Sequence, residues 1–166
     1  MQAEIQATYT ISRAEYLQAI RRHYRRSLKY GLEMAFSLMI ITLGLDMLQS
    51  EKGRALAWIH ISVGLLLLLR LNYAVWLMPV LMYRNQPRLQ SENHLIFDES
   101  GIHVQTDQIQ SQLQWSFYPS WRLDDQYYYL YDAKKDPSVI PRRAFSAEAD
   151  RELAELLQQK IGPPVK

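Results

Sequence analysis

The residues best placed to do chemistry are the titratable side chains inside the most apolar part of the chain. His60 and Arg70 lie in the run ALAWIHISVGLLLLLRLNYAVWLM, and Glu33 lies near the start of GLEMAFSLMIITLGLDML. An ionisable residue within a membrane span either lines an ion or proton pathway or pairs with an opposite charge. Glu33 and Arg70 fall toward the same end of their two helices, so we favour an ion pair across the helices over a proton relay.

Two groups of arginines are candidate sites for an anion or a lipid head group. A guanidinium binds phosphate or carboxylate through two parallel hydrogen bonds. A basic cluster beside an apolar helix suits anionic lipid heads, so lipid contact is the favoured interpretation of the first group. For the second group, together with Lys134 and Lys135, a solvated loop is the favoured interpretation. The candidates are Arg21, Arg22, Arg25 and Arg26 in the first group, and Arg142 and Arg143 in the second.

No pattern of residues points to catalysis or to a bound metal. The histidines, His23, His60, His94 and His103, do not occur at the HxH or HxxxH spacings of metal sites. The chain has no Cys, which excludes thiolate ligands, disulfides and a thiol nucleophile. It also has no GxSxG, glycine-rich phosphate loop or paired-carboxylate motif. We therefore expect no catalytic residue, no cofactor, no metal and no enzymatic activity.

Two long apolar runs predict a transmembrane helical hairpin within residues 31–83. The first, residues 31–48, would extend about 27 Å as a helix, close to the thickness of a hydrocarbon core. The second, residues 55–78, contains five consecutive leucines that make it apolar on every side, unlike the striped surface helix of a soluble protein. Those leucines roughly offset the insertion penalty of Arg70. A short polar turn, Gln49 to Arg54, joins the runs, and a soluble protein with two buried apolar helices is the alternative.

The distribution of basic residues predicts that both termini face the cytoplasm. Lys and Arg near the ends of spans stay on the cytoplasmic side. Seven of them flank the outer ends of the hairpin and two lie in its turn: Arg21, Arg22, Arg25, Arg26, Lys29, Arg84 and Arg88, against Lys52 and Arg54. The first residues do not form the apolar core of a signal peptide. We therefore expect that the first span is not cleaved off and that the protein is a multi-pass membrane protein.

The polar segments predict a small antiparallel sheet closed by a helix. Residues 4–11 alternate as a strand does, and Ser12 with Glu15 forms a capping box for an amphipathic helix. Closely spaced strand-like runs between residues 94 and 140 indicate one antiparallel meander, to which the N-terminal strand can add. Ser146 caps a final helix, to about Ile161, that covers the sheet. The expected organisation is α+β, with an N-terminal strand and helix (1–30), the hairpin (31–83) and a sheet-and-helix domain (84–166).

The chain resembles a known family over essentially its whole length. The segments IFDESGIHVQTDQIQSQLQWSFYPSW, YYYLYD and VIPRRAF, followed by a capped helix that begins with acidic residues, resemble the YcxB-like proteins. These are bacterial membrane proteins with two transmembrane helices and a domain likened to pleckstrin-homology (PH) folds. The resemblance implies structural roles for Gly101 in a turn, Trp115 in the core and residues 141–145 at a strand-to-helix junction. It implies no defined activity.

The expected function is a membrane-anchored, non-enzymatic interaction module in the bacterial inner membrane. Its cytoplasmic domain would bind a protein, a peptide or anionic lipid heads, with membrane lipids and an unidentified protein, self included, as partners. The alternative is a homo-oligomeric membrane component with a polar path through His60 and Arg70. The near balance of 19 basic and 17 acidic residues argues against nucleic acid as a partner.

Overall fold

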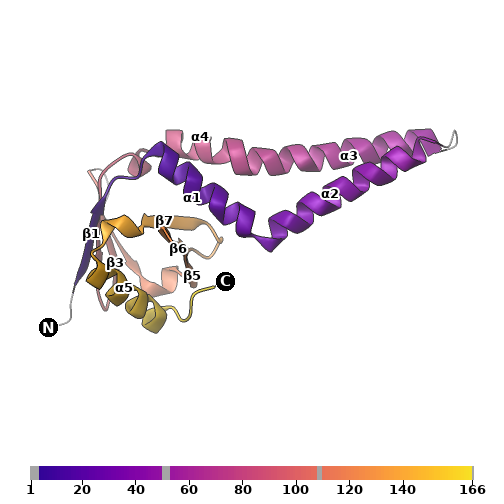
Figure 1. Ribbon diagram of the computed structural model, residues 1–166. Coiled ribbons are helices and arrows are strands. Elements are labelled where there is room, and N and C mark those ends of the chain that lie inside the picture. The colour runs from indigo at the N-terminus through magenta and orange to yellow at the C-terminus, as the bar shows by residue number, and fades with distance from the viewer. Residues whose placement is uncertain (1–3, 50–52, 108–109, 166) are drawn as a thin grey trace. The chain divides into compact units, whose positions relative to one another are not determined.

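The computed structural model describes residues 4–49, 53–107 and 110–165 and shows an α+β fold with antiparallel sheets. The chain divides into two compact units (Figure 1). The sheet unit contains Met1–Tyr16 and Gln86–Lys166, and the helical unit contains Leu17–Asn85. Of the predicted turn between the apolar helices, residues 50–52 lie outside the described residues.

Within the helical unit, α2 (Leu28–Met47) and α3 (Arg54–Asn72) run side by side as a hairpin (Figure 1). Small residues allow the close approach of their backbones. A β-carbon added at Gly44 would lie 2.9 Å from the Ala57 carbonyl oxygen, and one at Gly64 would lie 2.9 Å from that of Ser37. By length and composition, both helices could cross a membrane.

The second apolar helix extends further than the predicted end at Met78. After α3 it continues through a π-helical turn, η2 (Tyr73–Leu77), into α4 (Met78–Asn85), which makes one helical run of 32 residues from Arg54. Pro79 lies inside this helical run. A proline has no N–H for the carbonyl four residues earlier and its ring crowds that carbonyl. The wide turn just before Pro79, where Met78 N–H bonds to the Tyr73 carbonyl, accommodates this defect.

The N-terminal helix α1 (Arg13–Arg26) ends before α2 and does not run directly into it. Ser27 interrupts the two helices with an extended backbone, φ −73° and ψ 119°. Serine is a preferred residue at such a helix start, although its hydroxyl makes no capping bond here. The first apolar helix consequently begins at Leu28, three residues before its predicted start.

The sheet unit contains two antiparallel sheets, so the single meander predicted from the sequence is wrong. The first has the order β1-β2-β3-β4 and the second β5-β6-β7. Their strands are β1 (Ile5–Tyr9), β2 (Asn93–Phe97), β3 (Gly101–Gln105), β4 (Gln110–Gln114), β5 (Ser120–Leu123), β6 (Tyr127–Tyr131) and β7 (Pro137–Pro141). Strand β1 pairs with β2 in the register Ile5↔Phe97, which joins the N-terminus to the first sheet.

The division into two sheets arises between β4 and β5. A 3₁₀ turn, η4 (Trp115–Phe117), follows β4. Trp115 donates its indole N–H to the Asp98 carbonyl at 3.1 Å, which turns its side chain inward. Pro119 then lacks a ladder donor, so a strand cannot continue through it. The chain leaves the first sheet here and starts the second.

An aromatic core lies between the two sheets and α5 (Ala147–Lys160). The Phe145 ring lies 6.1 Å from that of Phe97 in β2 and 6.0 Å from that of Tyr128 in β6. Leu153 and Leu157 of α5 are fully buried. The predicted caps are confirmed: Ser146 Oγ accepts from Ala149 N–H, and Ser12 and Glu15 exchange bonds of 2.9 and 3.2 Å.

Candidate binding surfaces

The helical unit exposes many large apolar side chains along α2 and α3. In their most hydrophobic stretches only 11% and 17% of the residues are buried. Leu32, Leu66 and Leu69 are each more than 60% exposed. A contiguous apolar surface of this kind marks a site that contacts lipid or another protein.

The first arginine group lies on α1. Arg25 and Arg26 are exposed in its last turn, and Arg22 is half-buried. Arg21 places its guanidinium 4.4 Å above the ring of Trp76, a cation–π contact. Its Nε is buried without a hydrogen-bond partner among the described residues. The group therefore divides into a packed member, Arg21, and an exposed pair, Arg25 and Arg26.

Glu33 and Arg70 are brought together across the hairpin. Arg70 Nη2 lies 2.5 Å from Glu33 Oε2, and Lys29 Nζ lies 3.8 Å from Glu33 Oε1. The Arg70 side chain is 61% exposed and that of Glu33 is 31% exposed. The geometry is that of the predicted ion pair, held at the edge of the helix contact.

His60 bonds within its own helix. Its Nδ1 lies 2.8 Å from the Leu56 carbonyl oxygen, one turn earlier. A ring nitrogen that donates to this carbonyl needs no partner from another helix. No observation in the described residues connects His60 with Arg70 along a polar path.

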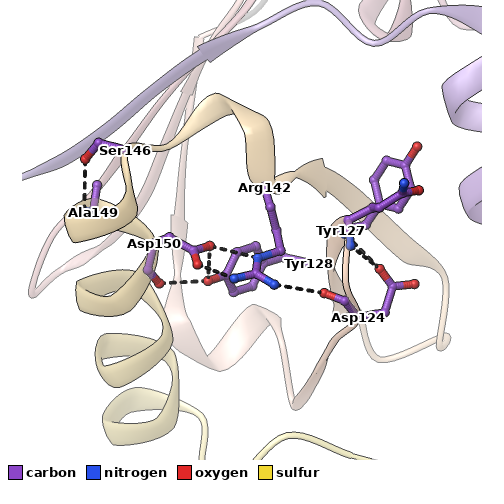
Figure 2. A network of polar contacts seen from close by, with 8 residues as sticks. Asp124, Tyr127, Tyr128, Arg142, Ser146, Ala149 and Asp150 are labelled. Carbon is purple, nitrogen blue, oxygen red and sulfur yellow. Dashed lines mark hydrogen bonds and ion pairs between the residues drawn. The ribbon is translucent and has the colours of Figure 1, made fainter.

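Arg142, from the second group, lies in a network inside the sheet unit (Figure 2). Its Nε donates to Asp150 Oδ1 at 3.0 Å and its Nη2 donates to Asp150 Oδ2. The Asp150 carboxylate holds the pKa of Arg142 above its ordinary value, and Arg142 in turn lowers the pKa of Asp150. The Tyr128 hydroxyl donates to the same carboxylate at 2.8 Å. The pKa of Tyr128 is raised, first by burial and second by its hydrogen bond to Asp150. The Asp150 carboxylate in the first turn of α5 thus holds both Arg142 and Tyr128 of β6.

Arg143 makes an equivalent bond to the N-terminal segment of the sheet unit. Its Nε and Nη2 lie 2.8 and 3.0 Å from the two carboxylate oxygens of Glu15, and Nη2 also donates to the Thr10 carbonyl at 2.9 Å. This guanidinium lowers the pKa of Glu15 to about 2. Because the guanidinium groups of Arg142 and Arg143 are already paired with carboxylates, both arginines stabilise the fold in this conformation.

A buried arginine and a buried aspartate at the second sheet, Arg122 and Asp124, went unnoticed in the sequence. Arg122 is 8% exposed and lies over the Tyr129 ring at 4.6 Å. Its Nε and Nη2 are buried with no hydrogen-bond partner among the described residues. Asp124 accepts from the Gln126 and Tyr127 amides, both at 2.9 Å, and from the Tyr129 hydroxyl at 3.1 Å. The only signal in the sequence was an Arg at an alternating strand position, which also fits a solvated edge.

The outer face of the first sheet carries a shallow, open depression of about 370 Å³. Histidine and glutamine side chains provide most of its polar lining: His94, His103, Gln105, Gln110 and Gln112. His94 Nδ1 lies 2.9 Å from Thr8 Oγ1, and His103 Nε2 lies 2.8 Å from Asp98 Oδ2. In the described residues, no three His, Cys, Asp or Glu side chains are grouped to hold a metal ion.

Comparison with known proteins agrees with the resemblance seen in the sequence. Residues 97–157 match the family model described as YcxB-like protein. The matched segment begins at the last residue of β2 and ends within α5, so it contains Gly101, Trp115 and the Pro141–Phe145 junction. No curated protein and no solved structure matches the chain.

Proposed function

We propose that this chain, with its YcxB-like segment, is a membrane-anchored, non-enzymatic interaction module. The hairpin of α2 and α3 spans the bacterial inner membrane, both termini face the cytoplasm, and the sheet unit is the cytoplasmic domain. The exposed apolar surface of α2 and α3 carries the proposal. In water this surface would favour aggregation, whereas in a bilayer it meets hydrocarbon.

The anchor also binds anionic lipid heads through the exposed end of α1. Arg25 and Arg26 lie immediately before Leu28, where the apolar helix begins. A basic residue near the surface of an anionic leaflet adds about 1 kcal/mol of attraction. Arg142 and Arg143 contribute less to this binding because they are paired with carboxylates.

The sheet unit is a PH-like domain in this proposal. Support comes from the YcxB-like match and from the order of a four-stranded sheet, a three-stranded sheet and a closing helix. We propose the domain as a binding surface for protein or lipid rather than as a catalyst. The alternative, self-association around a polar path through His60 and Arg70, has less support, since both side chains bond within the hairpin.

Cysteine labelling of the full chain tests the anchor. The chain has no Cys, so Gln49→Cys introduces a single thiol beside the turn of the hairpin, and Glu155→Cys introduces one on α5 as the matched control. In intact cells, an impermeant maleimide added from outside is expected to label Cys at 49 and not at 155. Labelling only at 155 would reverse the topology, and extraction of the chain by alkaline carbonate would contradict membrane insertion.

Native mass spectrometry of the detergent-solubilised chain tests lipid binding. The double variant Arg25→Gln/Arg26→Gln is expected to weaken phosphatidylglycerol binding about tenfold or more, with phosphatidylcholine binding unchanged. Lys134→Gln/Lys135→Gln removes the same charge from the β6–β7 turn and should leave lipid binding as in the parent. Equal losses in both variants would show a general charge effect and would contradict a specific role for α1.

A further inference from the structure

Three of the four outer strand edges in the two sheets carry a feature that limits further pairing. Beside β1, η5 (Arg142–Ala144) supplies Arg143, which donates to the Thr10 carbonyl just after the strand. Strand β7 has proline at both ends, Pro137 and Pro141. Along β5, Val165 N–H donates to the Trp121 carbonyl at 2.8 Å. Natural sheets protect their edges with prolines, charges and covering segments of this kind.

The remaining edge, β4, has none of these protections among the residues that the structure describes. Its sequence, Gln110 to Gln114 (QSQLQ), contains no charge, proline or glycine. It pairs with β3, and no second strand pairs with it in the part of the chain that the structure describes. An exposed strand of this composition is a template for another strand.

The register shows which backbone groups of β4 point to the open edge. Alternate residues of an antiparallel strand direct N–H and C=O to opposite neighbours. Gly101 directs its carbonyl toward β2, where Asp98 N–H donates to it at 3.1 Å, so Ile102 and Val104 direct theirs toward β4. Their partners there are Leu113 and Ser111. The backbone groups of Gln110, Gln112 and Gln114 therefore point away from β3.

We propose that β4 pairs antiparallel with β4 of a second copy of this chain and joins two four-stranded sheets into one of eight. A two-fold axis at Gln112 would place Gln112 opposite its own copy and Gln110 opposite Gln114. Like charges directly opposite each other destabilise a strand pair, and β4 brings no charge to this pairing. In such a pairing the same strand of each copy provides hydrogen-bond partners for the outward backbone groups of the other, as a two-fold dimer requires.

The exposed side chains of the strand favour this partner. Gln110, Gln112 and Gln114 alternate on the outer face, and an amide can donate to and accept from an identical amide. Anchoring in one membrane, which rests on the proposed function, raises the local concentration of copies. A strand carrying net charge would instead select a foreign partner of opposite charge.

Light scattering of the purified full chain gives the test. The parent is expected to have a protein mass of twice 19.6 kDa. Gln112→Pro removes an outward N–H and leaves the β3 bonds in place, so the mass should fall to that of the monomer. Gln112→Lys and Gln112→Glu each place like charges opposite one another, and each should weaken the dimer at least tenfold. Mixing these two variants with different tags should restore co-purification.

The control is Gln6→Lys, which adds the same charge to the outer face of β1 and should leave the dimer intact. Circular dichroism checks that each variant is folded. A monomeric parent, a dimeric Gln112→Pro variant, or a Lys–Glu mixture that stays apart would each overturn the proposal. The mass can be measured without detergent if the chain proves not to insert, so the failure of the dimer and that of the anchor are distinguishable.

Discussion

Glu33 in α2 and Arg70 in α3, separated by 37 positions in the sequence, hold their charged groups 2.5 Å apart. The outer surfaces of both helices around them are apolar. Hydrocarbon solvates neither charge, so in a bilayer each of the two side chains depends on the other. The ion pair therefore fixes the register of α2 against α3 and also stabilises their contact.

Removing one member of this pair is expected to destabilise the hairpin. Arg70→Leu leaves the Glu33 carboxylate with only the longer contact to Lys29, 3.8 Å away, and we expect a loss of about 2–3 kcal/mol, comparable to the insertion penalty of one charge. The double variant Glu33→Leu/Arg70→Leu should recover most of the loss. Steric trapping in detergent micelles measures this free energy of unfolding. A single variant as stable as the parent would show that Glu33 finds another partner.

The two glycines in the helix contact should tolerate no larger residue. Gly64→Ile would press against the Ser37 carbonyl oxygen and the Ile41 side chain, since a β-carbon there would lie 2.9 and 2.5 Å from them. We expect a loss of more than 2 kcal/mol from overpacking. Gly31→Ile in α2 is the matched control, because a β-carbon there has no neighbour within 4 Å. Equal stability of both variants in the same assay would refute close packing at Gly64.

The Glu15–Arg143 pair should make part of the stability depend on acid. The pKa of Glu15 is lowered from 4.5 to about 2, so its contribution is complete above about pH 5 and is lost as the pH falls toward 2. The Arg143 side chain is 54% exposed, and after allowance for solvent screening we expect about 1 kcal/mol.

Thermal unfolding of the parent and of Glu15→Gln checks this dependence. The difference in stability between them should be largest near neutral pH and should vanish at strongly acidic pH. Glu155→Gln, on the exposed face of α5, provides the control for loss of a carboxylate. A constant difference across the pH range would rule out the ionised pair as its source.

Two arginines of the second sheet and its junction should respond in opposite ways to removal. Arg142→Met leaves Asp150 without its cation and should destabilise by about 2–3 kcal/mol. Arg122→Met replaces a buried guanidinium with two unsatisfied nitrogens, so we expect a change below about 1 kcal/mol, or a gain. Denaturant titration of both variants compares them directly. A large loss at Arg122 would show that its contact with the Tyr129 ring outweighs the cost of its two unsatisfied nitrogens.

The elements that the sequence predicted well are those with strong local signals. The apolar runs, the capping box at Ser12 and the cap at Ser146 depend on neighbours within a few residues, which the chain itself displays. The π-helical turn at Tyr73–Leu77 in the second apolar helix was not predicted, because no single residue type marks such a turn.

The candidate site was harder to predict because its contacts are long-range. A guanidinium looks the same in sequence whether it faces water or a carboxylate, and Glu15 lies 128 residues from Arg143. The two-sheet arrangement likewise depends on the inward turn of Trp115 toward Asp98, 17 positions earlier. Pairings over such separations follow from the tertiary fold rather than from local propensity.

The length of the helix from Arg54 to Asn85 has a mechanical consequence. Its 32 residues would measure about 48 Å, whereas a hydrocarbon core is about 30 Å thick. A helix anchored with its N-terminal end at the far leaflet would extend about 18 Å past the core as a stiff rod. The π-turn and Pro79 lie near the point where the helix would leave the hydrocarbon core. A small change of the helix angle at this point would displace the C-terminal end of the helix by a large distance.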